Sequence, residues 1–335
     1  MSKKKLIILI VLPFIIFFAS LLIGRYPVSL ITVFQVLLSK IFPIEPTWVP
    51  TAETVIFQVR LPRAIIALAV GSSLAISGSS FQGMFQNPLV SSQILGVSAG
   101  AGFGAALAII IGGNGLVVQL FAFCGGILAV FLAYMISRIH KTTPTLMLVL
   151  AGFIVGALFS ALISLLEYIA DPYDQLPAIV FWLMGSLSTS SLKDLVYAIP
   201  PIAFGTVGLL LVRWRINILS MGDEQARSLG VNTEPLKLFI IFCCTIITAA
   251  SVCVSGIIGW IGLVIPHIAR MIVGPNHKVL LPASISLGAS YLLVIDNIAR
   301  TITTAEIPLS ILTAIVGAPF FAYLLRRTRG GMEGK

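Results

Sequence analysis

The sequence contains few charged residues, and this scarcity excludes most soluble functions. Only 10% of its 335 residues are charged and 58% are hydrophobic, whereas soluble domains carry roughly a quarter charged residues. No polar segment is long enough to form a water-soluble catalytic domain. The sequence also lacks a GxxxxGK[ST] phosphate loop, so it does not bind ATP by that route. The composition therefore predicts a polytopic membrane protein.

Histidine and cysteine are too few and too scattered for a metal centre. The three His and four Cys do not share a metal-ligand spacing, and all four Cys lie in apolar segments. No nucleophile–base pair stands out, which argues against an intramembrane enzyme. We expect a non-catalytic chain that binds no metal.

The hydrophobic residues fall into ten segments, each near the roughly 20 residues that a helix needs to cross a bilayer. These segments are 6–24, 61–80, 93–111, 116–137, 145–167, 192–212, 238–255, 258–273, 280–298 and 308–325. The first resembles a signal peptide, but no small-x-small cleavage site follows it, so we expect an uncleaved helix. The pattern predicts an all-α bundle of ten transmembrane helices that forms one domain over residues 1–335.

Lysine and arginine are unevenly distributed between the two sides of such a bundle. An even number of spans places both termini on one side, which then holds fifteen of the 21 basic residues and leaves six for the other. Because basic loops stay in the cytoplasm, we expect both termini and the loop 213–237 to be cytoplasmic. The net charge of +9 does not indicate nucleic-acid binding, since the basic residues flank apolar segments rather than gathering on one polar face.

The loop 213–237 is the most polar interruption between two spans and holds seven charged side chains. Apolar residues recur inside it, and Gly222 and Gly230 are typical helix boundaries. The pattern predicts two short helices joined at Gly222, with Ala226 and Leu229 on one helical face. An amphipathic unit of this kind suits the groove of a partner protein, and a solvated linker is the alternative.

Acidic residues are scarce within the spans. Only Glu167 and Asp296 come near a span, and both lie toward its outer end. A proton- or sodium-coupled transporter normally needs ionisable groups at mid-membrane, so a secondary transporter or channel is the less favoured alternative. We expect the energy for any transport to come from another subunit.

Three arginines lie at the outer ends of two spans. Arg60 and Arg63 lie at the start of the second span, and Arg300 follows Asp296 by four residues in the ninth, so that these two can pair along one helix face. Anchoring at the membrane interface is one interpretation. The other is a basic collar that receives carboxylates of an external partner.

The fifth span follows a cytoplasmic turn and carries small residues. Thr142 and Thr143 precede Pro144 in the turn HKTTPT, where they would cap the helix. Gly152, Gly156 and Ser160 follow at intervals of four residues and allow another helix backbone to approach closely.

These motifs together resemble the FecCD-type permeases, the membrane subunits of ABC importers for iron-siderophore complexes, haem and cobalamin. The matching stretches are spread over most of the chain and occur in the same order as in the family. It is carried by QVRLPR at 58–63, FQNPLVSSQILGVSAGAG at 85–102, MGDEQARSLGV at 221–231, SGIIGWIGLVIPHIAR at 255–270, LLPASISLGAS at 280–290, DNIAR at 296–300 and EIPLSILTAIVGAPFF at 306–321.

The resemblance implies a fold, partners and residue roles. Two permease copies, identical or paralogous, would lie in a bacterial inner or plasma membrane. They would work with two cytoplasmic ABC ATPases, which bind ATP and Mg, and with an extracytoplasmic substrate-binding protein. This chain itself would bind no cofactor. The implied cargo is an iron-siderophore complex, with haem, cobalamin or molybdate as alternatives. The implied sites are ATPase coupling at Leu219, Met221, Gly222, Asp223, Glu224, Ala226, Arg227, Leu229 and Gly230, binding-protein docking at Arg60, Arg63 and Arg300, a cytoplasmic gate at Thr142 and Thr143, and a translocation path along Gly152, Gly156 and Ser160.

Overall fold

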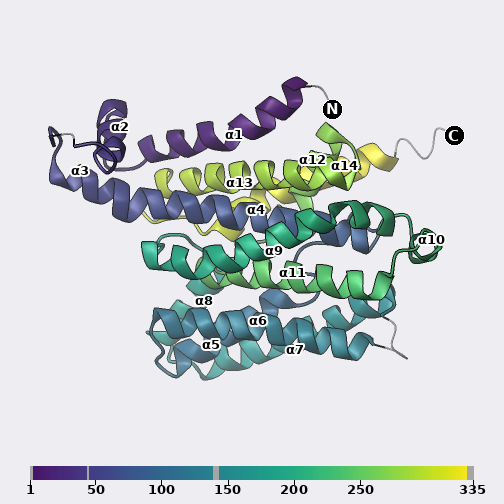
Figure 1. Cartoon of the computed structure of the whole chain (residues 1–335). Coiled ribbons are helices and arrows are strands. Elements are labelled where there is room, and N and C mark those ends of the chain that lie inside the picture. The colour runs from purple at the N-terminus through teal and green to yellow at the C-terminus, as the bar shows by residue number, and fades with distance from the viewer. Residues whose placement is uncertain (1–2, 44, 139–142, 330–335) are drawn as a thin grey trace.

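The computed structural model describes residues 3–43, 45–138 and 143–329, and every regular element in these ranges is helical. The helices are α1 (Lys3–Leu22), α2 (Leu30–Leu38), α3 (Pro50–Thr54), the π-helix η1 (Val55–Arg60), α4 (Leu61–Met84), α5 (Val97–Ile110), α6 (Gly115–Ser137), α7 (Thr145–Ile169), α8 (Gln175–Met184), α9 (Leu192–Leu219), α10 (Asp223–Ser228), α11 (Thr233–Ser255), α12 (Ile261–Val273), α13 (His277–Thr301) and α14 (Leu309–Arg329). The long helices run side by side, with α2 and α3 at one end of the bundle and α10 at the other (Figure 1).

Each of the ten predicted spans contains a helix, which confirms the all-α membrane bundle. Among the described residues, six helical stretches are long and apolar enough to cross a membrane: Pro50–Met84, α6, α7, α9, α11 and α13. The other four predicted spans coincide with the shorter apolar helices α1, α5, α12 and α14. The total of ten crossings therefore stays a prediction.

Several predicted boundaries differ from the structure, and the second and third spans show why. The span expected at 93–111 begins only at Val97, because residues 85–96 form an irregular segment that contains Pro88 and ends at Gly96. Gly96 has a backbone φ of 81°, which favours glycine, and α5 begins at the next residue. The span expected at 61–80 is longer than predicted, because α3 and η1 continue directly into α4.

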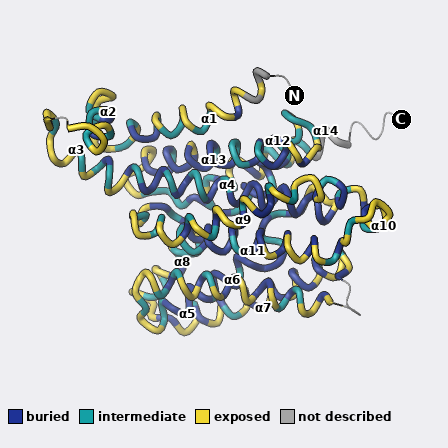
Figure 2. Tube along the Cα trace, in the orientation of Figure 1, coloured by how far each residue is buried: buried dark blue, intermediate teal, exposed yellow. Residues whose placement is uncertain are grey.

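Helices α4, α11 and α13 form the interior of the bundle, whereas α7 and α9 lie at its surface (Figure 2). In the most apolar window of α4, 78% of the residues are buried, against 28% in α7 and in α9. Glycines make the close packing possible. A Cβ atom on Gly71 of α4 would lie 2.2 Å from the carbonyl oxygen of Gly288 on α13, and one on Gly78 would lie 1.9 Å from that of Gly262 on α12. These contacts confirm the predicted packing role of small residues.

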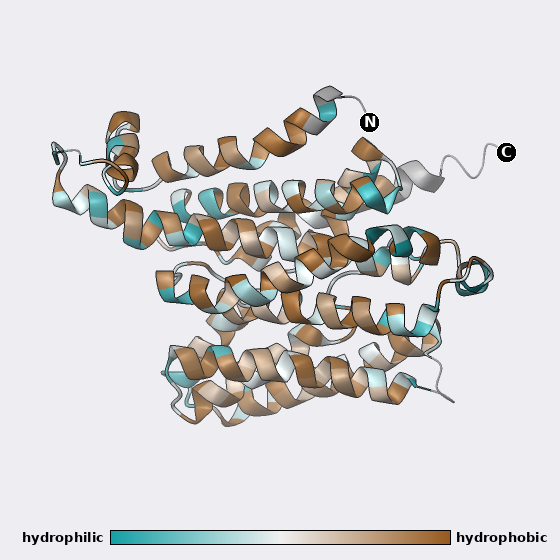
Figure 3. Ribbon diagram, viewed as in Figure 1, coloured by the Kyte–Doolittle hydropathy of each residue, from teal (hydrophilic) through white to brown (hydrophobic). Residues whose placement is uncertain are grey.

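Hydrophobic residues predominate along the helices, and hydrophilic residues gather toward the two ends of the bundle (Figure 3). The candidate coupling and docking residues and Thr143 of the candidate gate lie at these ends, whereas the candidate path residues lie within α7. We call the end that carries α10 the coupling end, and the end that carries α2 and α3 the collar end. The first turns of α1 lie at the coupling end together with α10 (Figure 1).

Candidate functional site

The predicted coupling loop folds as a compact unit at the coupling end. Helix α9 runs without interruption to Leu219, the turn Ser220–Gly222 follows, and α10 occupies Asp223–Ser228. The prediction of two short helices joined at Gly222 is therefore wrong, because the first of them is the last turn of α9. Gly222 and Gly230 bound α10 with φ angles of 121° and 80°, which a residue with a side chain rarely adopts.

The apolar residues of this unit divide into two groups. Leu219 and Ala226 are fully buried and pack into the core with residues of α9 and α11. Met221 and Leu229 are 61% and 60% exposed, so the expectation that Ala226 and Leu229 form one apolar surface is also wrong. The burial of Leu219 and Ala226 holds the unit in place, and the exposure of Met221 and Leu229 leaves two large apolar side chains available to a partner.

Charged side chains connect α10 to the start of α7. The Lys237 ammonium on α11 forms an ion pair with Asp223 at the start of α10, and it lies 3.5 Å from the backbone oxygen of Thr143. The backbone N–H of Thr143 donates to Oε2 of Glu234 at 3.0 Å, and the Arg227 guanidinium lies 3.7 Å from the same carboxylate. We call Asp223, Arg227, Glu234 and Lys237, with the Thr143 backbone, the coupling-end network.

This network was not predicted from the sequence. The sequence indicates the charges of Glu234 and Lys237 but not that both reach Thr143, which is about 90 residues distant along the chain. Thr143 is buried, and its backbone N–H and C=O are both bonded to α11. The other predicted gate residue, Thr142, lies outside the described residues.

The three arginines predicted to form an exposed basic collar are buried instead. The Arg60 guanidinium donates to the backbone oxygens of Leu21 and Leu22 at 2.7 and 3.2 Å, which satisfies the C-terminal carbonyls of α1. The Arg300 guanidinium donates to the backbone oxygen and the hydroxyl of Ser20 at 2.7 and 2.9 Å. Both arginines therefore fasten α1 to the bundle.

Arg63 lies at the centre of the collar end and holds two carboxylates. It pairs with Asp296 of α13 at 2.8 Å and with Glu306, which precedes α14, also at 2.8 Å. Asp296 lies 4.0 Å from Arg300 as well, which agrees with the predicted pairing along α13. Arg63 and Arg300, which were expected to receive carboxylates of an external partner, thus already contact carboxylates of this chain. We call Arg60, Arg63, Asp296, Arg300 and Glu306 the collar-end network.

The predicted translocation residues on α7 differ in burial. Residues four apart on a helix are rotated by about 40°, and the environment changes along the series. Gly152 is buried, and a Cβ atom there would lie 2.3 Å from the backbone oxygen of Ile94. Gly156 is half-buried next to Gly96, and Ser160 is exposed. Gly152 therefore packs within the chain, whereas Ser160 lies on the open side, and the path along these residues stays a prediction.

No group of three or more His, Cys, Asp or Glu that could hold a metal ion occurs within the described ranges. The cysteines Cys243 and Cys244 are free and buried in α11. The two ends are held by ion pairs and hydrogen bonds between helices. This arrangement can transmit displacement, and it offers surfaces to partners.

Comparisons with known proteins agree with this geometry. Residues 9–327 match the FecCD transport family. The chain is 46% identical over 317 residues to the molybdate import system permease protein MolB of Haemophilus influenzae, covering 94% of this chain and 93% of that one. It is 45% identical over 276 residues to a "Probable iron chelatin transport system permease protein" of Helicobacter pylori, with 82% and 83% covered.

A solved structure shows the same fold. It is described as an inward-facing conformation of an ABC transporter assigned to the metal-chelate type, and it superimposes with a TM-score of 0.87 at 43% sequence identity, covering 97% of this chain and 100% of the other. The matches extend over nearly the whole chain. The chain belongs to the FecCD transport family of ABC importer permeases.

Proposed function

We propose that this permease couples ATP hydrolysis on separate ATPase subunits to import through its unit Leu219–Gly230. The observation that carries the proposal is the pair of exposed apolar side chains, Met221 and Leu229, on a unit that buried Leu219 and Ala226 fix to the bundle. A flexible linker would not hold two large apolar groups in water. Two anchors of this type on a short helix suit a hydrophobic groove on a partner.

The coupling end faces the cytoplasm in this proposal, because the positive-inside distribution of lysine and arginine places the loop 213–237 there. Displacement of α10 by the ATPase then acts on α11 directly and on α7 through the coupling-end network. Helix α7 is the segment of the predicted path, so rotation or tilting of α7 opens and closes that path as a rigid-body change.

A second permease copy covers part of the exposed apolar surface of α7. Phe153, Ile154, Leu158 and Leu165 are all more than half exposed, and Ser160 lies among them on the open side of the helix. A path between two copies would be lined by this face and not by Gly152. The face offers no charged side chain within the helix except Glu167 near its end, so it should hold cargo weakly.

The cargo we propose is an iron-siderophore complex, and molybdate is the second candidate. The iron chelatin permease of Helicobacter pylori supports the first, and the higher coverage of the molybdate permease of Haemophilus influenzae supports the second. The apolar path carries no fixed charge that would select between a large neutral chelate and a small oxyanion. Selection would then reside in the binding protein.

Uptake in proteoliposomes tests the proposal. The permease is reconstituted with its cognate ATPase and binding protein, and uptake of a ferric siderophore, molybdate, haem and cobalamin is measured with and without ATP. We expect ATP-dependent uptake of the ferric siderophore. Uptake of molybdate alone would favour the second candidate. Accumulation against a gradient by the permease without an ATPase would refute the proposal.

The docking role of Arg60, Arg63 and Arg300 stays a proposal, and we propose it most specifically for Arg63. Asp296 is buried, but the Glu306 side chain is 27% exposed, so a carboxylate of a binding protein could replace Glu306 on Arg63 without opening the core. The replacement of Glu306 by Gln tests this, because it frees one side of the guanidinium. Tighter docking at low salt in that variant is expected, and unchanged docking would leave the collar-end network a purely internal structure.

A further inference from the structure

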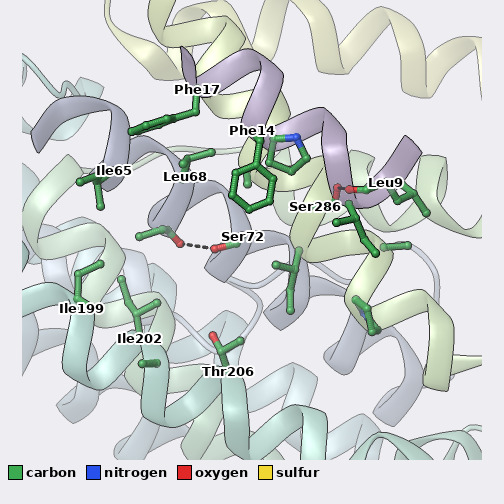
Figure 4. Close-up of a pocket in the computed structure, with 18 of the residues that line it drawn as sticks. Leu9, Phe14, Phe17, Ile65, Leu68, Ser72, Ile199, Ile202, Thr206 and Ser286 are labelled. Atoms are coloured by element: carbon green, nitrogen blue, oxygen red, sulfur yellow. Dashed lines mark hydrogen bonds between the residues drawn. The ribbon is translucent and has the colours of Figure 1, made fainter. Parts of the chain in front are cut away.

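A groove of about 720 Å³ lies between α1, α4, α9 and α13, away from both networks (Figure 4). Its walls are apolar side chains such as Phe14 and Phe17 of α1 and Ile199 and Ile202 of α9. Its three hydroxyl groups belong to Ser72, Thr206 and Ser286. The volume and the apolar lining are typical of a ligand site.

The groove exists because α1 is fastened to α13 at two points. The Ser286 hydroxyl donates to the backbone oxygen of Leu9, and the Arg300 guanidinium donates to that of Ser20 at 2.7 Å. Between these two points, Ile10 and Phe14 line one side of the groove, and Ala203 of α9 lines another. These three residues are also exposed on the surface of the bundle, so the groove opens outward.

The surroundings of the opening indicate that hydrocarbon fills it. Phe14 of α1 and Phe204 and Val207 of α9 are each more than half exposed, and in a membrane protein such a surface lies in the lipid core. Two of the three hydroxyls in the groove are bonded internally, Ser72 to Ala69 and Ser286 to Leu9. A peptide would leave its own N–H and C=O groups unsatisfied there, whereas an acyl chain would not.

The coupling end of the groove is basic. Lys278 directly precedes Val279, which lines the groove, and Lys5 lies one turn before Leu9, which also lines it. Both lysines are exposed, and the Lys5 ammonium donates to the backbone oxygen of Ile272 at 2.9 Å. Neither residues 1–44 nor residues 235–295 contain an Asp or Glu, so the segments that form this rim bring no negative charge of their own.

We propose that this groove holds an acyl chain of an anionic phospholipid from the cytoplasmic leaflet, with the headgroup phosphate at Lys5 and Lys278. Basic pockets between helices on the cytoplasmic side of a membrane bind anionic headgroups in this manner. The occupant is a membrane phospholipid and not a transported cargo. The lipid stabilises α1 against α9, from which α1 would otherwise be separated by an empty apolar space.

Native mass spectrometry of the purified full-length chain tests the proposal. The chain is supplied with equal amounts of dioleoyl-phosphatidylglycerol and dioleoyl-phosphatidylcholine. We expect the wild type to retain phosphatidylglycerol preferentially, and the Lys5→Glu/Lys278→Glu variant to lose this preference by roughly tenfold or more. Ala203→Phe, which fills the groove, should reduce the retention of both lipids. Lys193→Glu and Cys124→Phe, which change charge and bulk at other exposed positions, are the matched controls.

Two results would overturn the proposal. The first is equal retention of both lipids by the wild type and all variants, which would mean that only unspecific lipids of the annulus are bound. The second comes from a photoactivatable benzophenone residue placed at Ile10 of the full chain in vesicles of both lipids. Cross-linking to another copy of the chain, rather than to lipid, would assign the groove to a protein interface.

Discussion

The replacement of Lys237 by Met tests whether the coupling-end network transmits movement from α10 to α7. Lys237 is the central member of the network, since its ammonium contacts both the Asp223 carboxylate and the Thr143 backbone oxygen. Methionine has a similar length and an apolar stem, so it preserves the packing of this buried side chain and removes the charge. The change therefore affects the connection without opening a large cavity.

The structure sets the magnitude of this effect. Loss of one partner of a fully buried ion pair costs about 3–5 kcal/mol, and loss of an exposed pair costs about 0–1 kcal/mol. The Lys237 side chain is 3% exposed but that of Asp223 is 32% exposed, so water can solvate the remaining carboxylate. For Lys237→Met we expect an intermediate loss of about 1–3 kcal/mol in the interaction free energy of this contact. If the contact carries the coupling between α10 and α7, that coupling becomes roughly 5- to 150-fold weaker.

The assay is cargo taken up per ATP hydrolysed in proteoliposomes that contain the permease, its ATPase and its binding protein. We expect Lys237→Met to retain ATP hydrolysis and to lower this ratio. Lys40→Met is the matched control, because Lys40 forms an ion pair with Glu53 at 2.9 Å on an exposed surface of the collar end. An unchanged ratio in Lys237→Met, with the ATPase still bound, would refute the transmission role and leave Lys237 a structural residue. Absence of transport by the wild-type complex would instead refute the proposed function.

Three further changes test the other contacts. Asp296→Asn should lower the free energy of unfolding by about 3–5 kcal/mol, since it removes the buried carboxylate of Arg63 and leaves only the partly exposed Glu306. Glu53→Gln in the exposed pair should cost about 0–1 kcal/mol, and thermal unfolding in detergent measures both. Gly78→Ala should cost about 3 kcal/mol or more, because its Cβ atom would meet a backbone oxygen, and Gly259→Ala, which meets no atom within 4 Å, should be neutral in the same assay. Leu229→Ser should weaken binding of the ATPase by roughly tenfold without changing the unfolding temperature, and unchanged binding would remove Leu229 from the interface.

Much of the helical framework could be predicted because it follows from the length and hydrophobicity of local segments. The ten apolar segments each contain a helix, and the glycines of α4 make close contacts with neighbouring helices. The start of α5 was misplaced because the apolar residues of 93–96 are not helical, although Pro88 and Gly96 are local signals of an interruption.

The rotation of side chains about each helix could not be predicted in the same way. Arg63 was correctly placed at the end of a span, but its partners Asp296 and Glu306 lie 233 and 243 residues away along the chain. Without the tertiary structure, a terminal arginine that faces the lipid interface is indistinguishable from one that faces another helix. The same ambiguity explains Gly152, which packs within the chain although Ser160, two turns later, is exposed.

The two networks differ in burial, and this difference indicates where the bundle can move. At the collar end, Arg63 and Asp296 are both at least 95% buried, so separating them would leave charges in a medium of low dielectric at a cost of several kcal/mol. At the coupling end, Asp223, Arg227 and Glu234 are partly exposed and Lys237 alone is buried, so water can solvate both carboxylates when their partners leave. The free energy needed to rearrange helices is therefore lower at the coupling end. A motor that acts on α10 would find the helices there able to separate while the collar end keeps α1, α4 and α13 together.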